Sequence, residues 1–131
     1  TNLTVALGRV FFRADTLAEG SELWASNGTT AGTGLVTDLA LGIANSSPGL
    51  EDSAELGGEL YFSANGPNGI ELFKTNGTSA GTAQVVDLNP GGADSSPEGL
   101  TVYAGKIYFA ATASAPTGRE LYCTDGTAPG D

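Results

Sequence analysis

Carboxylates are the side chains of this chain that could do acid–base chemistry, and they recur at a fixed spacing. Glu22, Glu71 and Glu120 lie 49 positions apart, as do Asp38 and Asp87. The sequence contains no His, which removes the usual general base, the Ser-His triad and imidazole metal ligands. Acid–base catalysis would therefore fall to these carboxylates.

Their recurrence favours a structural role over a catalytic one. A unique active site more often uses residues found in one copy only, whereas residues present in every copy usually hold the turns and ladders of that copy together. We therefore interpret the three Glu as structural, and we expect the two Asp to cap loop amides. The sequence predicts no catalytic residue and no enzyme activity.

Acidic loops could supply oxygen ligands to Ca²⁺ at Asp38, at 51–53 and at Glu59. The glycine-rich stretch 91–94 matches the calcium nonapeptide only faintly, and the acidic spacing of an EF-hand loop is absent. Because acidic loops on soluble proteins are usually just solvated, we expect neither a metal site nor another cofactor.

Asparagines in Asn-x-Ser/Thr tripeptides are the candidate modification sites. Four of the seven Asn stand in such tripeptides: Asn2, Asn27, Asn45 and Asn76. Two of them belong to one repeated Asn-Gly turn, where both residues are also favoured because they tolerate positive φ. Two interpretations stay open: N-glycosylation in a secreted eukaryotic protein, or a turn that is purely structural.

The recurring Glu begins a segment that the chain repeats three times, at 22–29, 71–78 and 120–127. Residues 2–14 also match 99–111 without a gap, and the middle copy has two extra residues near position 54. A period of about 20–50 residues indicates that one supersecondary unit has been copied and that no single copy can bury its own apolar face. We expect a single domain of three tandem units, spanning roughly 1–48, 49–97 and 98–131.

Each unit is predicted to contain four short strands. A Leu-Thr-Val strand is followed by a Gly turn and an aromatic strand, such as 10–12 or 60–62, which is a hairpin pattern. The Glu-Leu-aromatic segment is the third strand, and the Val-x-Asp-Leu segments at 35–39 and 85–88 are the fourth. Twenty Gly, six Pro and no apolar stripe at helical spacing predict an all-β chain.

Four strands in about 45–50 residues is the size of a β-propeller blade. Leu23 and Trp24 point to opposite faces of the third strand, so both faces of the predicted sheet are partly apolar. A closed propeller has typically about four to eight blades, and three units of which the last lacks its fourth strand cannot close such a ring. We therefore expect blade-like units that something outside this chain completes.

Charge and composition limit the partners. A net charge of −10 with only five basic residues makes nucleic acid and anionic membranes poor partners. No stretch approaches the roughly 18 apolar residues of a membrane span, and the start at Thr1 without Met indicates a processed form or a fragment. The single Cys123 excludes an internal disulfide, and we expect a small, partly buried apolar residue there; the alternative is an intermolecular bridge or a reactive thiol.

The repeated motif also points to a family. Residues 22–33 read Glu-Leu-Trp-x-x-Asn-Gly-Thr-x-x-Gly-Thr, and 71–82 repeat this with Phe73 in place of Trp. Together with Val-x-Asp-Leu-Asn-Pro-Gly at 85–91, the pattern resembles the ELWxxDGT repeat, a module of secreted and surface proteins of bacteria and other aquatic organisms. The resemblance covers essentially the whole chain. The chain departs from it by Asn at 27 and 76, Ala-Leu-Gly at 40–42 and Gly-Asp at 130–131.

The resemblance implies a propeller-like all-β fold and an extracellular or cell-surface setting, and it implies no catalytic residues. Two function classes follow. In the first, the chain is a structural subunit of an extracellular assembly, an oligomer or a filament, in which other copies complete its open edge. In the second, it is a carbohydrate-binding, lectin-like or adhesive module, which exposed aromatics would favour. A third interpretation is a fragment of a larger propeller protein. We favour the first because of the missing fourth strand, the absence of His and the acidic, Gly/Thr/Ser-rich composition; the repeated aromatics lie in predicted strands, which argues against the second.

Overall fold

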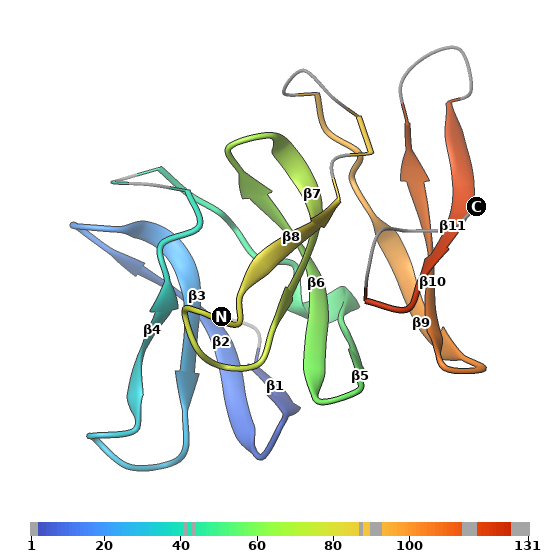
Figure 1. Cartoon of the computed structure of the whole chain (residues 1–131). Coiled ribbons are helices and arrows are strands. Elements are labelled where there is room, and N and C mark those ends of the chain that lie inside the picture. Colours follow the sequence, from blue (N-terminus) through green and yellow to red (C-terminus); the bar gives the residue numbers. More distant parts are fainter. Residues whose placement is uncertain are drawn as a thin grey trace.

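The computed structural model describes residues 3–40, 42, 44–86, 88–89, 93–113 and 118–126. These residues form three antiparallel sheets of four, four and three strands, with one short 3₁₀ helix, η1, at Leu50–Asp52. Figure 1 shows the sheets side by side in chain order. The predicted all-β class is confirmed.

Each sheet is built from neighbouring segments of the chain. The first sheet has the order β1 (Leu3–Ala6), β2 (Arg9–Thr16), β3 (Gly20–Ser26) and β4 (Thr33–Thr37). The second has the order β5 (Ala54–Leu56), β6 (Glu59–Gly66), β7 (Gly69–Thr75) and β8 (Ala83–Val86). The third has β9 (Glu98–Tyr103), β10 (Lys106–Thr112) and β11 (Arg119–Thr124), with β10 in the middle. In the part of the chain that the structure describes, the outer edge of β11 pairs with no strand.

The first hairpin of each sheet turns in two residues. Leu7 and Gly8 have φ of 54° and 72°, and Ala104 and Gly105 have 51° and 76°. Positive φ at both central residues defines the turn type whose twist matches that of paired strands. The Gly at the second position therefore allows the first two strands to pair without a longer loop.

The predicted end of the fourth strand was wrong. The strand was expected to cover 35–39, but β4 runs from Thr33 to Thr37 and the chain leaves the sheet before Leu39. The backbone N–H of Leu39 binds a side chain, Glu22, instead of the strand ladder. The two extra residues of the middle copy fall where η1 precedes the short strand β5.

Two apolar layers hold the sheets together, one on each face of the second sheet. The layer between the first and second sheets contains Ala6, Phe11, Leu23, Ala25, Val36, Leu39, Leu50, Leu60, Phe62, Ala64 and Phe73. The layer between the second and third sheets contains Tyr61, Leu72, Leu100, Ile107, Phe109 and Ala111, with Val85, Leu88 and Tyr122 packed against it. Burial of one large apolar side chain is worth about 1.5–3 kcal/mol, so these layers dominate the packing.

The two layers are built from corresponding positions. Phe62 faces Phe73 across β6 and β7, and their rings stack at 6.3 Å. Phe109 faces Tyr122 across β10 and β11, and their rings stack at 6.1 Å. Each aromatic pair lies on the face of its sheet that is turned toward the preceding sheet.

Polar contacts accompany the apolar layers at the inner side of the sheets, where β1 meets η1 and β5 meets β9. Asp52 of η1 accepts hydrogen bonds from the backbone N–H groups of Gly99 and Leu100, at 2.6 and 3.0 Å. Lys74 of β7 donates to the carbonyl of Gly126 at 2.9 Å. These contacts fix the position of the third sheet against the second.

Tyr61 makes the second layer sensitive to alkaline pH. Its side chain is 1% exposed, and burial raises its pKa above the ordinary value of 10.0, with smaller contributions from the charges of Glu59 and Asp125. Because the pKa is higher in the folded than in the unfolded chain, the stability linked to neutral Tyr61 is present below pH 10 and is lost as the pH rises through the folded pKa.

We therefore expect the free energy of unfolding to fall as the pH rises from 10 through the raised pKa of Tyr61, and Tyr61→Phe to remove part of that fall. Denaturant titrations across this range measure it. Tyr103→Phe is the matched control, because Tyr103 is 70% exposed. Equal pH dependence in the Tyr61→Phe variant and the unmodified chain would contradict the prediction.

Candidate functional site

The recurring Glu of the first sheet is a buried carboxylate surrounded by hydrogen-bond donors. Glu22 lies in β3 and is 0% exposed. Its oxygens accept from the backbone N–H of Leu39 at 3.0 Å and of Ala40 at 3.2 Å. They also accept from Ser46, at 3.2 Å from its N–H and at 2.6 Å from its hydroxyl. We call this arrangement the carboxylate clamp: it joins the third strand to the end of the fourth and to the segment that leads to the next sheet.

The second sheet has the same clamp. Glu71 in β7 is 0% exposed, and its Oε2 accepts from the N–H of Leu88 at 3.2 Å and from the hydroxyl of Ser95 at 2.5 Å. The residues that follow the two clamp serines, Ser47 and Ser96, have φ of 46° and 47°. Positive φ is uncommon for Ser. The chain therefore makes the same unusual turn after each clamp.

Because Glu22 and Glu71 are fully buried, the stability of the clamp depends on the hydrogen bonds that their carboxylates accept. A hydrogen bond to a charged group contributes about 1.5–3 kcal/mol, whereas an ionised carboxylate left buried without donors costs several kcal/mol. The bonds to Glu22 and Glu71 thus offset the burial of their charge. Neither carboxylate is exposed, and in this geometry their hydrogen bonds link separate segments of the chain.

The third sheet has the same Glu in the same register but without the clamp. Glu120 of β11 pairs with Ala111 of β10. The other sheets show the same pairing, at Glu22 with Ala14 and at Glu71 with Ala64. Glu120 is exposed, and the next residue, Leu121, is 68% exposed. Among the described residues no fourth strand and no serine segment covers them.

Sequence reasoning missed the clamp serines. Ser46 and Ser95 are both 0% exposed, although neither was among the candidate site residues. A signal was present, because each clamp Ser follows its Glu by 24 positions. The spacing alone does not show that the two residues meet.

The other acidic residues that the sequence singled out accept hydrogen bonds from backbone N–H groups or form an ion pair. Asp38 follows β4, and its Oδ2 accepts from the N–H of Gly42 at 3.0 Å, a loop-capping contact of the expected kind. Asp87 lies outside the described residues. Of the calcium candidates, Asp52 binds backbone N–H groups and Glu59 pairs with Lys74 at 3.4 Å. Across the described ranges, no group of three or more Cys, Asp or Glu could hold a metal ion.

Two candidate glycosylation sites begin equivalent turns after β3 and β7. Asn27 and Asn76 are exposed, and each Oδ1 accepts from the hydroxyl of the Thr two positions on, at 2.7 Å from Thr29 and 2.6 Å from Thr78. A Cβ at Gly32 would lie 1.9 Å from Asn27 Oδ1. The turn therefore needs Asn and Gly for its own geometry.

The remaining two candidates differ. Asn45 is exposed, and its Oδ1 accepts from the N–H of Ser21 at 2.8 Å. Asn2 lies outside the described residues. N-glycosylation stays a prediction for all four Asn, and the mass of the intact protein would report it directly.

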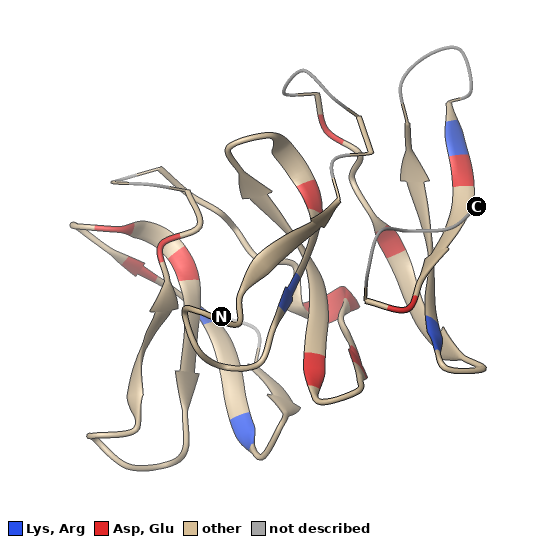
Figure 2. Ribbon diagram, viewed as in Figure 1, with Lys and Arg blue, Asp and Glu red and all other residues tan. Residues whose placement is uncertain are grey.

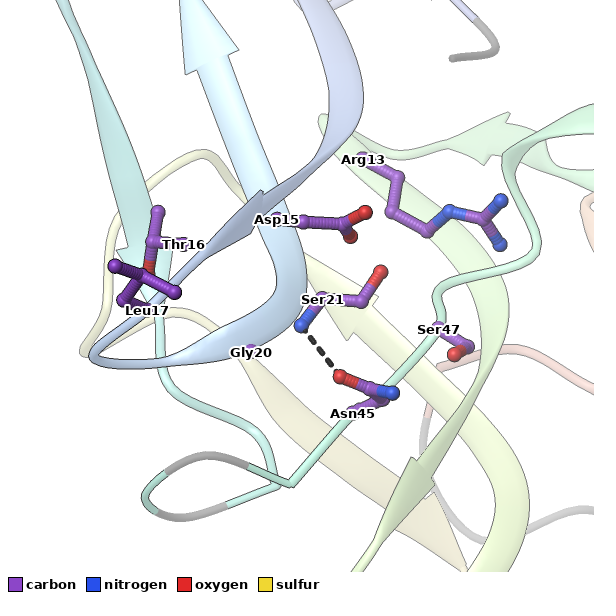
Figure 3. Close-up of a pocket in the computed structure, with 8 residues that line it drawn as sticks. All are labelled: Arg13, Asp15, Thr16, Leu17, Gly20, Ser21, Asn45 and Ser47. Carbon is purple, nitrogen blue, oxygen red and sulfur yellow. Dashed lines mark hydrogen bonds between the residues drawn. The ribbon is translucent and has the colours of Figure 1, made fainter.

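A polar cavity lies at the end of the first sheet. It has a volume of about 570 Å³ and is lined by Arg13, Asp15, Thr16, Leu17, Gly20, Ser21, Asn45 and Ser47. In Figure 3, Asn45 closes one side through its bond to Ser21, and Leu17 stands at the rim. Leu17 is 100% exposed and the lining includes no aromatic ring. The cavity therefore lacks a surface on which a sugar ring would stack.

Most aromatic side chains of the sheets belong to the apolar layers. Phe11, Phe62, Phe73, Phe109 and Tyr61 are at most 3% exposed. Cys123 in β11 is a half-buried free thiol. Acidic residues lie on all three sheets, as Figure 2 shows. The described residues contain no helix that is long and apolar enough to cross a membrane.

Comparison of the chain with protein-family models, with curated proteins and with solved structures finds no match. The arguments about function therefore come from the residues and contacts of this chain.

The clamp predicts opposite outcomes for one substitution at equivalent positions. Glu22→Ala removes the acceptor of four hydrogen bonds, from the N–H groups of Leu39 and Ala40 and from the N–H and hydroxyl of Ser46, and we expect it to lower the free energy of unfolding by about 3 kcal/mol or more. Glu120→Ala removes an exposed side chain, and we expect a change within about 0.5 kcal/mol. Denaturant titration measures both. Similar losses for the two variants would contradict the structural role of the clamp.

Proposed function

We propose that this chain is a non-enzymatic structural module of an extracellular assembly, in which other copies of the chain cover its two outer faces. The observation that carries the proposal is a difference in burial. Leu50 and Leu100 are 2% and 9% exposed, because each packs in the layer against the preceding sheet. Leu3, the corresponding residue of the first sheet, is 73% exposed.

The opposite face shows the complementary difference. Leu23 and Leu72 are 0% exposed, because each packs toward the following sheet, whereas Leu121 of the third sheet is 68% exposed. The outer face of the first sheet thus exposes apolar groups that would complete an apolar layer against the outer face of the third sheet. Exposed apolar groups arranged as half of a repeated interface support a head-to-tail contact between copies.

A polar contact between the first two sheets supports the same arrangement. Arg9, the first residue of β2, donates to the carbonyl of Gly77 in the second sheet at 3.2 Å. Lys106, the first residue of β10, holds the same place in the third sheet and is exposed. In a head-to-tail contact, Lys106 would meet the corresponding carbonyl, that of Gly28, on the next copy.

We also propose that the three sheets are blade-like repeat units. Neighbouring sheets make their contacts near their first strands, at β1 with η1 and at β5 with β9. A fan that converges on its first strands is the arrangement of propeller blades. Two copies, each with three sheets, would bring six blades together, which is within the range of about four to eight that closed propellers use.

The alternative of a carbohydrate-binding, lectin-like or adhesive module has less support. The repeated aromatics are mostly buried, and the cavity at the end of the first sheet has no aromatic lining, although Tyr108 and Phe109 line another cavity of about 470 Å³. The extracellular setting rests on the acidic, His-free composition and on the resemblance to the ELWxxDGT repeat.

Size measurement with face variants tests the assembly. We expect the unmodified chain to have at least twice its chain mass of 13.1 kDa in light scattering after size exclusion. Leu3→Asp or Leu121→Asp should each give monomers, because a charge on either half of the layer would have to be buried. A mixture of the two variants should form a dimer, since one intact face of each kind remains.

Leu17→Asp is the matched control: Leu17 is 100% exposed but lies outside both faces, and its substitution should leave the mass unchanged. Circular dichroism checks that every variant keeps its strands. An unmodified chain that stays monomeric at high concentration would overturn the assembly proposal.

A further inference from the structure

The outer edges of β3 and β7 are covered in the same way. At one end of the edge, hydroxyl pairs join the strands, with Ser26 to Thr33 and Thr75 to Thr82 both at 2.6 Å. Between the ends, the fourth strand pairs in an antiparallel ladder. At the other end, the carboxylate clamp holds the residues that follow the fourth strand.

The edge of β11 carries the same series of side chains. Thr124 corresponds to Thr75, since each faces the second residue of the preceding strand, Ile107 or Leu60. At the clamp end, Glu120 and Leu121 stand in the register of Glu71 and Leu72 but are exposed. Glu120 and Leu121 therefore present receptor groups for one kind of segment, whereas Thr124 is 1% exposed and accepts a hydrogen bond from the N–H of Gly126.

We propose that the outer edge of β11 binds an extended segment with the sequence character of residues 82–97. The inference rests on the proposed assembly function and names the partner of its open edge. The required features are two Val in the strand, a Leu N–H beyond the strand and a Ser hydroxyl seven positions after that Leu.

Glu120 makes the edge selective. Any strand could pair with an open edge through its backbone. A strand without the clamp donors, however, would cover Glu120 and leave its charge buried and unpaired, which is strongly unfavourable. A segment that brings the Leu N–H and the Ser hydroxyl gives the carboxylate the two donors that Glu71 Oε2 has. The Val and Leu side chains would also cover Leu121, as Val85 and Leu88 pack in the second layer.

A synthetic peptide of residues 82–97 and the full chain provide the test. We expect the peptide to bind, and Glu120→Ala in the chain or Ser95→Ala in the peptide to weaken binding by about tenfold or more. Combined, the two changes should weaken binding hardly more than either alone, because they remove the same contact. Calorimetry or fluorescence anisotropy measures the four combinations.

The register gives a second readout that does not depend on affinity. Lys74 faces Ala83 across β7 and β8, and Cys123 has the place of Lys74 in β11. A peptide with Ala83→Cys should therefore form a disulfide with Cys123, because facing residues lie within the Cα separation that a disulfide spans. A peptide with Gln84→Cys should react far more slowly, since its thiol points to the other face.

Each outcome either supports or overturns the proposal. Selective reaction of the Ala83→Cys peptide, lost in the Cys123→Ser chain, together with the non-additive pair of substitutions, supports the proposal. No binding, equal reaction of the two Cys peptides, or additive losses overturn it. A chain that forms oligomers but does not bind the peptide overturns this inference and keeps the assembly proposal. A monomeric chain that binds the peptide keeps this inference and overturns the assembly proposal.

Discussion

The buried carboxylate of the third strand is the interaction on which each complete sheet depends. Glu22 is wholly buried, and its donors lie 17 and 24 positions further along the chain, at Leu39 and Ser46. A buried charge is tolerated only when such donors are in place. The third strand, the fourth strand and the following segment must therefore assemble together. The four-stranded sheet thus folds as one cooperative unit, because no single segment is stable without the other two.

Packing between sheets has a different origin. Each buried Phe or Leu contributes about 1.5–3 kcal/mol, and the two layers contain many such side chains. The partly exposed pair of Lys74 and Glu59 belongs to a class worth about 0–1 kcal/mol. The apolar layers thus supply most of the attraction between sheets, while the few polar contacts, such as Asp52 with the start of β9, determine how the sheets are aligned.

The strands, the hairpins and the open outer edge of the third sheet follow from the sequence because local signals produce them. The Gly turns and the alternation of apolar residues act within a few positions, and the 49-residue period repeats the signal three times. The clamp was not predictable, because it depends on contacts across 17 to 24 positions. The same contacts explain the error at the end of β4: the N–H of Leu39 could bind either the ladder or Glu22, and burial of the carboxylate decides in favour of Glu22.

The two faces of each sheet are not alike, and this limits how copies could meet. One face presents an aromatic pair such as Phe62 and Phe73, and the other presents residues such as Leu23 and Phe11. A symmetric contact would join like faces and would match neither observed layer. A contact that repeats the geometry of the layers joins unlike faces, so it is heterologous and propagates in one direction. Whether repetition closes into a ring or continues as a filament then depends on the rotation between sheets, which the first strands and η1 set at the inner side.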